Sequence, residues 1–404
     1  MHTFEFNSVG RVVFGRGQAR RLGEIVAARG STNSPGASAP AALVVHNGWQ
    51  PGDGSAADRA AGGVEAAGVR TAFYRQRGEP TVDDVDRALA VAREHGCDRV
   101  IGLGGGSAID AAKAVAGLLT NGGAALDYME VIGKGQKITK PAAPWVAVPT
   151  TAGTGAEATR NAVIGHPGKR FKASIRSELL LPRVAVVDPE LGVGVPPEVT
   201  ARSGMDALCQ CVEAYTSNGA NPMTDAVALQ GVTLAARSLR RAFEDGRDLD
   251  AREDMALAAL LSGIALTNAG LGAVHGFAAP LGANFPAPHG AVCAVLLPHV
   301  IGANVAALRN DSAGQPVLAR YGTVGRLLAG RADLPDGTAV EAAVAATAAL
   351  VQELNIPPLS AYGLTAADVP GLVALARKAS SMKFNPVVLP DDALADVLRA
   401  AIGP

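Results

Sequence analysis

A carboxylate, an amide and two imidazoles in this 404-residue chain have the types and spacing of ligands to a metal ion. Asp206 and Gln210 are four residues apart, so they lie on one face if their segment is helical. His275 and His289 follow in a later segment that is rich in glycine and proline. Oxygen and nitrogen donors of this kind can hold a divalent ion and leave a position for a substrate oxygen. We therefore predict a metal site at Asp206, Gln210, His275 and His289.

Gln210 is the unusual member of this set, because a neutral amide is a weaker ligand than an imidazole. Taken alone, Asp206 and Gln210 also fit a plain helix with local hydrogen bonds. Cys209 and Cys211 flank Gln210, but residues i and i+2 of a helix point about 200° apart, so they cannot both join one site. We interpret these two cysteines as core residues.

Composition excludes several classes of partner. The net charge is −1, with 36 basic and 37 acidic residues, and aromatic residues make up 4% of the chain. Neither value favours binding to nucleic acid or to a membrane surface. No uninterrupted apolar run reaches about 18 residues, so no transmembrane helix is predicted. Four irregularly spaced cysteines without a secretory signal indicate free thiols in the cytoplasm.

The order of predicted elements indicates two domains. Predicted strands are Ala42–His46, Val69–Phe73, Arg99–Leu103, Trp145–Val148 and Arg183–Val187. Predicted helices of the first half are Gln18–Arg29, Val82–Glu94 and Ala108–Leu119; those of the second are Pro197–Ser217, Thr224–Asp245, Arg252–Ala269 and Val340–Glu353. Strands that alternate with helices predict a Rossmann-like, doubly wound parallel sheet. The sequence therefore predicts an α/β domain over residues 1–191 and an all-helical domain over 192–404, with ligands in a cleft between them. The low-complexity segment 31–40 is predicted to be a surface loop.

Two loops that follow predicted strands are suited to a nucleotide. Gly104, Gly105, Gly106 and Ser107 lie between a strand and a helix, where backbone N–H groups can approach a pyrophosphate. A second loop offers the hydroxyls of Thr150, Thr151 and Thr154 to a phosphate or a ribose. Lys172 follows the next strand-like run and is a further candidate for these groups. A bare glycine-rich or threonine-rich turn, and a solvated lysine, are the alternative interpretations.

These motifs together resemble the iron-containing (group III) alcohol dehydrogenase family along nearly the whole chain. The motifs that carry the resemblance are Phe14-Gly15-x-Gly17, Gly104-Gly-Gly-Ser-x-x-Asp110-x-x-Lys113, Pro149-Thr-Thr-Ala-Gly-Thr-Gly155, Asp188-Pro189, Gly204-Met-Asp206-Ala-Leu, Glu213-Ala-Tyr215, His275-x-x-Ala-x-Pro-Leu-Gly282 and Pro288-His289-Gly290. The resemblance implies that the first domain binds NAD(P) and that the helical, dehydroquinate synthase-like domain holds the metal. It also implies hydride transfer between nicotinamide and an alcohol or aldehyde carbon.

The chain departs from the pattern of the family at three positions. The usual fourth ligand is a histidine four residues after the aspartate, and Gln210 stands there. A further histidine linked to proton transfer is Ala279 here, which leaves water, the ribose hydroxyls or, by residue type alone, His46 and His299 as proton sources. Many NAD-preferring relatives carry an acidic residue near Asn47, and an amide there repels a 2′-phosphate less than a carboxylate would. The expected cofactors are NAD or NADP, with a slight preference for NAD, and a weakly bound Fe²⁺ or Zn²⁺ ion.

The resemblance implies a metal-assisted alcohol dehydrogenase, or aldehyde or ketone reductase, that acts on a small molecule and forms a homo-oligomer, a dimer or larger. Three alternatives stay open. A reductase similar to maleylacetate reductase would work without the metal. A lyase similar to dehydroquinate synthase would need cationic groups for a phosphorylated polyol, and few Lys or Arg residues lie near the expected ligands. A non-catalytic nucleotide-binding relative would fit the altered positions.

Overall fold

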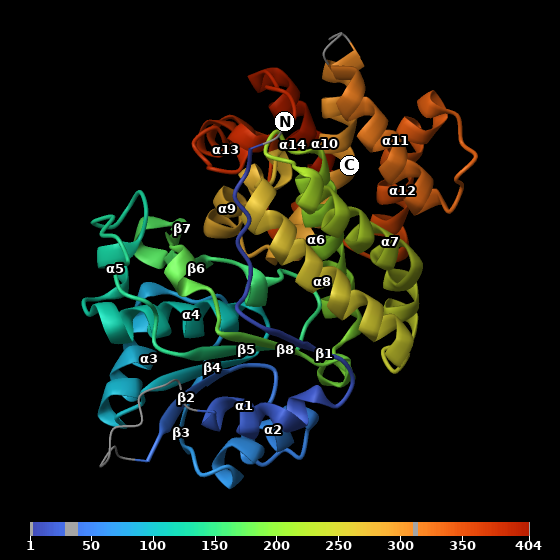
Figure 1. The fold of residues 1–404 in the computed structure, drawn as a ribbon. Coiled ribbons are helices and arrows are strands. Elements are labelled where there is room, and N and C mark those ends of the chain that lie inside the picture. The colour runs from blue at the N-terminus through green and yellow to red at the C-terminus, as the bar shows by residue number, and fades with distance from the viewer. Residues whose placement is uncertain (1–2, 29–38, 310–313, 404) are drawn as a thin grey trace. The chain divides into compact units, whose positions relative to one another are not determined.

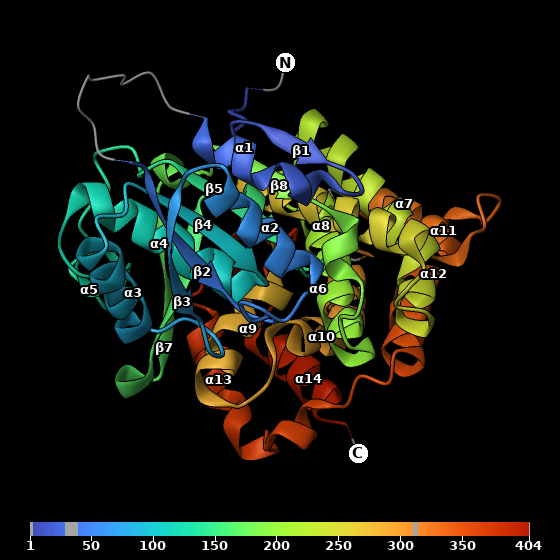
Figure 2. The same ribbon diagram turned by 90° about the horizontal axis from the view of Figure 1, so that it is seen from below.

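The computed structural model describes residues 3–28, 39–309 and 314–403 (Figures 1 and 2). Most of the segment predicted to be a surface loop, residues 31–38, lies outside these described residues. The chain forms two compact units. The first comprises Asn7–Thr151 and Ala156–Val193, and the second comprises Met1–Phe6, Ala152–Gly155 and Gly194–Pro404.

The first unit is built on a parallel sheet of six strands. In chain order the strands are β1 (Val12–Phe14), β2 (Ala41–His46), β3 (Arg70–Arg75), β4 (Arg99–Gly104), β5 (Trp145–Pro149) and β8 (Val184–Val187). Their order across the sheet is β1-β8-β5-β4-β2-β3. Strand β2 pairs in parallel with β3 on one side and with β4 on the other, with Val44 opposite both Phe73 and Ile101. The carboxyl ends of β2, β4 and β5 therefore meet at one edge of the sheet, where an open α/β sheet binds its ligands.

Helices cover both faces of this sheet, which explains why its central strands are almost wholly apolar. The helices are α1 (Leu22–Ala27), α2 (Ala56–Ala66), α3 (Val82–Glu94), α4 (Gly106–Asn121) and the short α5 (Ala125–Tyr128). Helices α1 and α2 pack on one face, with Leu22 and Val64 in the core there. Helices α3 and α4 pack on the other face, with Leu89 and Val115 in a separate core (Figure 1). The prediction of a doubly wound parallel sheet is confirmed.

Three strands of the first unit are absent from the sequence prediction. Strand β1 has three residues and pairs with β8 at the edge of the sheet. Strands β6 (Asn161–His166) and β7 (Phe171–Arg176) form a separate antiparallel pair. Their residues are largely half-exposed and include Lys172 and Arg176, so they lack the buried apolar run that marks the other strands.

The second unit is helical. Its helices are α6 (Pro197–Thr216), α7 (Pro222–Glu244), α8 (Leu249–Ala269), α9 (Ala273–Asn284), α10 (His289–Arg309), α11 (Gln315–Ala329), α12 (Asp336–Glu353), α13 (Val369–Ala376) and α14 (Asp391–Ile402). Helix α6 lies at the centre and contributes residues to the main core from Ala201 to Tyr215. Close packing against α7 depends on Gly231, where an added Cβ would lie 2.4 Å from Cys211 Sγ. Cys211 is thus a core residue, as its place on α6 predicts.

Helix α10 is apolar and long enough to cross a membrane by length and composition alone. However, 72% of its most apolar window is buried inside the protein. The core helix of a soluble protein has this combination of properties. We therefore attribute the apolar character of α10 to its place in the core of the helical unit.

Candidate functional site

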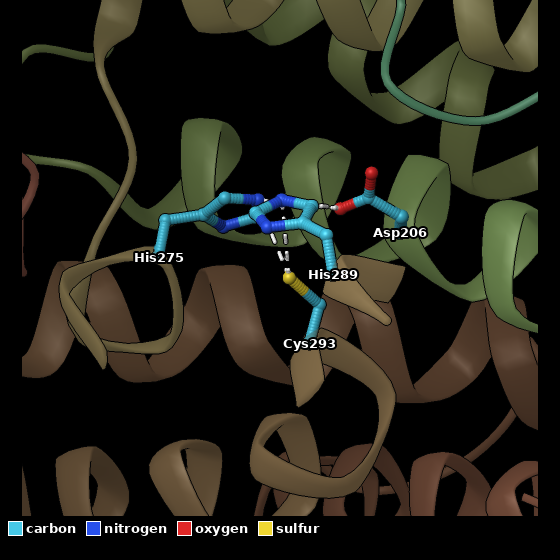
Figure 3. A group of neighbouring side chains, drawn as sticks. All are labelled: Asp206, His275, His289 and Cys293. Atoms are coloured by element: carbon cyan, nitrogen blue, oxygen red, sulfur yellow. Dashed lines mark hydrogen bonds and ion pairs between the residues drawn. The ribbon is translucent and has the colours of Figure 1, made fainter. Parts of the chain in front are cut away.

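Four donor atoms from three helices meet inside the helical unit (Figure 3). Asp206 comes from α6, His275 from α9, and His289 and Cys293 from the first turns of α10. Asp206 Oδ1 lies 3.3 Å from His275 Nε2 and 3.7 Å from His289 Nε2. Cys293 Sγ lies 3.6 Å from His275 Nε2 and 3.7 Å from His289 Nε2. One carboxylate, two imidazoles and one thiol are a donor set suited to a divalent transition metal.

The backbone brings α10 unusually close to α6, and this approach places His289 beside Asp206. An added Cβ at Gly290 would lie 2.2 Å from the carbonyl oxygen of Arg202 on α6. A side chain larger than hydrogen therefore cannot occupy this position without moving one helix. The Pro288-His289-Gly290 motif thus has a packing reason as well as a chemical one.

Glu213 fixes the orientation of the His275 ring. His275 Nδ1 lies 2.5 Å from Glu213 Oε2, and Val274 N donates to Glu213 Oε1 at 2.8 Å. A carboxylate that accepts from Nδ1 leaves Nε2 deprotonated and directed at a metal. Glu213 is 5% exposed, so this hydrogen bond is shielded from water.

Opposite charges in the cluster stabilise one another. Burial alone would raise the pKa of its acids and lower the pKa of its bases. Burial would raise the pKa of Asp206, but the charges of His289 and His275 hold this pKa below its usual value. Burial would lower the pKa of His289, but its interactions with Cys293 and Asp206 raise it to about 9. Burial raises the pKa of the Cys293 thiol well above its usual value. In the absence of a metal, protons on the imidazoles supply the positive charge that the carboxylate needs.

Gln210 lies on the same face of α6 as Asp206 and Glu213, at spacings of four and three residues. It is 2% exposed, and its Oε1 accepts a hydrogen bond from Ser262 Oγ on α8 at 3.0 Å. The carbonyl oxygen of Ala259 lies 2.8 Å from the same Ser262 Oγ, so the two acceptors share its single proton. The structure thus gives the amide oxygen of Gln210 a partner within the protein.

In the α/β unit, the glycine-rich loop lies where β4 ends and α4 begins. Asn47 Oδ1 accepts from the backbone N–H of Gly105 at 2.8 Å, and Thr150 N donates to the carbonyl oxygen of Gly104 at 2.9 Å. An added Cβ at Gly104 would lie 2.4 Å from Asn47 Oδ1, so only glycine fits there. An added Cβ at Gly105 would lie 3.3 Å from Thr151 Oγ1. Five of the predicted nucleotide-binding residues are therefore neighbours at one edge of the sheet.

The other predicted residues for the nucleotide are placed differently. Gly106 and Ser107 form the first turn of α4, which points its backbone N–H groups toward the loop. Thr154 belongs with Ala152–Gly155 to the helical unit, although Thr151 belongs to the α/β unit. Lys172 lies in β7, and its ammonium group pairs with Glu79. Lys172 is thus a paired residue of the second sheet.

The histidines considered as proton sources have other surroundings. His46 ends β2, is 3% exposed and packs its ring against Trp49 at 4.7 Å between centroids. Its Nδ1 has no hydrogen-bond partner among the described residues. His299 lies in α10, ten residues after His289, and burial lowers its pKa.

Sequence reasoning missed the roles of two residues, Glu213 and Cys293. Glu213 follows Asp206 by seven residues, which is two turns along the same helical face. Cys293 follows His289 by four residues, which is one turn. Both spacings are of the kind that linked Asp206 to Gln210, but spacing alone does not distinguish these residues from core residues.

Comparisons with known proteins point to one enzyme family. A model of the iron-containing alcohol dehydrogenases matches residues 10–189, and a model of the C-terminal domain of the Fe-containing alcohol dehydrogenase family matches residues 200–402. The chain is 39% identical over 324 residues to alcohol dehydrogenase 4 of Schizosaccharomyces pombe, covering 80% of this chain and 73% of the relative. It is 32% identical over 393 residues to an NAD-dependent methanol dehydrogenase of Bacillus methanolicus, covering 96% and 97%. A solved structure of a 1,3-propanediol oxidoreductase is similar with a TM-score of 0.88 and 34% identity, covering 99% of this chain and 100% of that one.

Proposed function

The chain belongs to the family of iron-containing alcohol dehydrogenases, and we propose that it interconverts a small alcohol and its aldehyde or ketone with a nicotinamide cofactor at a metal held by Asp206, His275 and His289. It is an oxidoreductase that acts on CH–OH groups. The observation that carries the proposed site is the convergence of these three donors from α6, α9 and α10. Fe²⁺ and Zn²⁺ are the ions that such a set of oxygen and nitrogen donors accepts.

A bound divalent ion would supply Lewis acidity, which polarises a carbonyl group and stabilises developing negative charge on its oxygen. The protein supplies the positions of the ligands. Glu213 holds the His275 ring with Nε2 toward Asp206, and the helical backbone fixes Asp206. His289 is the most exposed of the three, with 36% of its side chain accessible against 8% for His275 and 2% for Asp206. We place the access of the substrate on the side of His289.

We assign the cofactor to the α/β domain, residues 1–191, and the metal and substrate to the helical domain, residues 192–404. The loop Gly104–Ser107 and the first turn of α4 offer backbone N–H groups to the pyrophosphate. Thr150, Thr151, Thr154 and Lys172 are retained as residues for the phosphates and riboses. Asn47 closes the glycine loop through its Oδ1, and its neutral side chain tolerates a 2′-phosphate. NAD is the proposed cofactor, and the neutral side chain of Asn47 lets NADP serve as an alternative.

Ala279 offers no group for proton transfer. The proton that accompanies hydride transfer therefore exchanges with water or with a ribose hydroxyl of the cofactor. The substrate class is small alcohols and their carbonyl counterparts. We further propose a homo-oligomer, a dimer or larger, in the cytoplasm.

The test is oxidation of NADH and NADPH by a panel of short aldehydes, ketones and maleylacetate. Protein stripped by a chelator is compared with protein reconstituted with Fe²⁺ or Zn²⁺. Turnover that requires the metal supports the proposal. Equal rates in stripped protein would replace it with a metal-free reductase of the maleylacetate type, and no turnover of any carbonyl would exclude these substrates altogether.

A further inference from the structure

We propose that Cys293, and not Gln210, is the fourth protein ligand of the metal, so that the site is built from one carboxylate, two imidazoles and one thiolate. This inference rests on the proposed metal site and changes its chemistry. Cys293 Sγ lies within the same 4.8 Å group as the donor atoms of Asp206, His275 and His289 (Figure 3).

The oxygen–nitrogen and sulfur–nitrogen distances among the four donors are close to the edges of a metal tetrahedron. With metal bonds of about 2.0 Å to oxygen and nitrogen and about 2.3 Å to sulfur, tetrahedral angles separate oxygen from nitrogen by about 3.3 Å and sulfur from nitrogen by about 3.5 Å. The two oxygen–nitrogen distances from Asp206 are 3.3 and 3.7 Å. The two sulfur–nitrogen distances from Cys293 are 3.6 and 3.7 Å. These four distances are close to those of a tetrahedral site formed by side chains from three helices.

The helical position of Cys293 supports this role. It lies one turn after His289 on α10, so both side chains project from the same face of one rigid helix. Cys293 is fully buried, and its sulfur is directed at the two imidazoles. The amide oxygen of Gln210, by contrast, accepts a hydrogen bond from Ser262. Gln210 thus occupies the position of the usual histidine ligand, while Cys293 supplies a stronger donor from another helix.

A second group of donors, formed by Cys209, Glu213 and His275, lies beside the first. It has three members, and its carboxylate already accepts from His275 Nδ1 and Val274 N. A metal bound between Glu213 Oε2 and His275 Nδ1 would replace the hydrogen bond that orients the His275 ring toward Asp206. The first group therefore holds the ion, and Glu213 positions one of its ligands.

A thiolate ligand changes which metal the site prefers. When the ion binds, the thiol of Cys293 loses its proton to solvent and a metal–sulfur bond forms. Soft thiolate ligands favour Zn²⁺ over Fe²⁺ among the ions that this family accepts. With Asp206, the thiolate also brings two negative charges to a divalent ion, which strengthens binding and lowers the residual positive charge. The site is then expected to be a zinc site.

The experiment uses the full chain, stripped by a chelator and titrated with Co²⁺ in the absence of oxygen. The expected result is a near-ultraviolet absorption band from thiolate-to-cobalt charge transfer, which carboxylate and imidazole ligands do not produce. Loading with Zn²⁺ and measuring X-ray absorption should show sulfur at about 2.3 Å in the wild-type protein. Neither measurement requires turnover.

Cys293→Ser and Cys293→Ala should lose the band and the sulfur shell. Their affinity for Zn²⁺ should fall by more than about 100-fold, because loss of an outer-shell partner alone costs about 10- to 100-fold. Cys211→Ser is the matched control, since Cys211 is equally buried but packs against Gly231, and it should keep both signals. Gln210→Ala should also keep them. Circular dichroism of each variant tests that it is folded.

Each outcome decides between the alternatives. A band that persists in both Cys293 variants overturns the inference, and loss of the band in Cys209→Ser alone assigns the metal to the second group. Binding of Co²⁺ without any sulfur signal overturns the role of Cys293 and leaves the proposed metal-dependent function standing. Failure of the wild-type protein to bind Co²⁺ or Zn²⁺ overturns both.

Discussion

The two candidate sites of this protein are built from different parts of the polypeptide. The metal cluster of the helical unit consists of side chains, with four ionisable groups on three helices. The nucleotide loop of the α/β unit consists of backbone, with glycines that admit close contacts and a single amide, Asn47, that closes the loop. A metal site that is formed by side chains can exchange one donor for another if a neighbouring residue supplies the missing ligand. A loop that binds through its backbone cannot change in this way, because its shape depends on the absence of a Cβ atom.

The largest effect is expected where the metal cluster loses its carboxylate. Asp206→Asn keeps the shape of a side chain that is 1% exposed but removes the charge between His275 and His289. Turnover should fall by about 10³-fold or more, equivalent to about 4 kcal/mol of transition-state stabilisation. The measurements are metal content and kcat/KM, with Asp333→Asn as a control at an exposed ion pair. A variant that retains both metal and activity would show that the cluster is not the reactive centre.

A smaller effect is expected from the residue that positions a ligand. Glu213→Gln replaces a carboxylate that accepts from both His275 Nδ1 and Val274 N by an amide with one acceptor oxygen. The affinity for Zn²⁺ should fall by about 10- to 100-fold, while saturation with the metal restores most of kcat. Competition with a chromogenic chelator measures the affinity, and Glu341→Gln at the exposed pair with Arg309 is the control. Unchanged affinity would leave Glu213 with a purely structural role.

A substitution in the glycine loop should impair binding of the cofactor and leave the metal content unchanged. Gly104→Ala places a Cβ 2.4 Å from Asn47 Oδ1 and 2.9 Å from Ala108 Cβ, so the loop must shift. We expect a stability loss of about 1–3 kcal/mol and a higher KM for the nicotinamide cofactor, with metal content unchanged. Gly62→Ala in α2 is the matched control, because no atom lies within 4 Å of its added Cβ. A normal KM in Gly104→Ala would contradict the assignment of this loop to the cofactor.

The same contrast explains what could be predicted from the sequence. The central strands and long helices follow from buried apolar runs and helical periodicity, and Val82–Glu94 is observed with the predicted bounds. The glycine loop could be predicted because its glycines are consecutive and local. The edge strand β1 was missed because its apolar run has only three residues. The pair β6–β7 was missed because its residues are partly exposed and include Lys172 and Arg176, so no buried apolar run marks it.

The metal cluster was only partly predictable, because its members lie far apart in the chain. Asp206, His275 and His289 follow from residue type and from the resemblance to the family. The sequence does not distinguish Cys293 from a core cysteine, because its neighbours in the chain are apolar, as those of a core cysteine are. Only the packing of α10 against α6, which depends on Gly290, shows that its sulfur faces the two imidazoles.

The α/β unit also contains a largely buried ion pair of its own, in which Lys113 Nζ lies 3.5 Å from Asp110 Oδ1. Lys113 is fully buried, and its Nζ donates to Thr159 Oγ1 at 2.7 Å and to the carbonyl oxygen of Ala156 at 2.9 Å. Burial raises the pKa of the neighbouring Glu157 to about 7, although the charge of Lys113 opposes the shift. In the helical unit, the buried charges surround the proposed metal site. In the α/β unit, the buried ammonium group of Lys113 holds the segment after Gly155 in place.

Glu157 should make the stability of the protein depend on pH. Its pKa is higher in the folded protein than in the unfolded chain, so folding favours the protonated form. The stability that this proton confers is present below the usual pKa of a glutamate and is lost as the pH rises through about 7. For this shift, linkage gives a fall of about 1 kcal/mol between about pH 6 and pH 8. Glu157→Gln should remove that fall, and urea unfolding at the two pH values measures it. Glu94→Gln, at an exposed position near the end of α3, should leave the fall unchanged, and an equal fall in all three proteins would show that another group causes it.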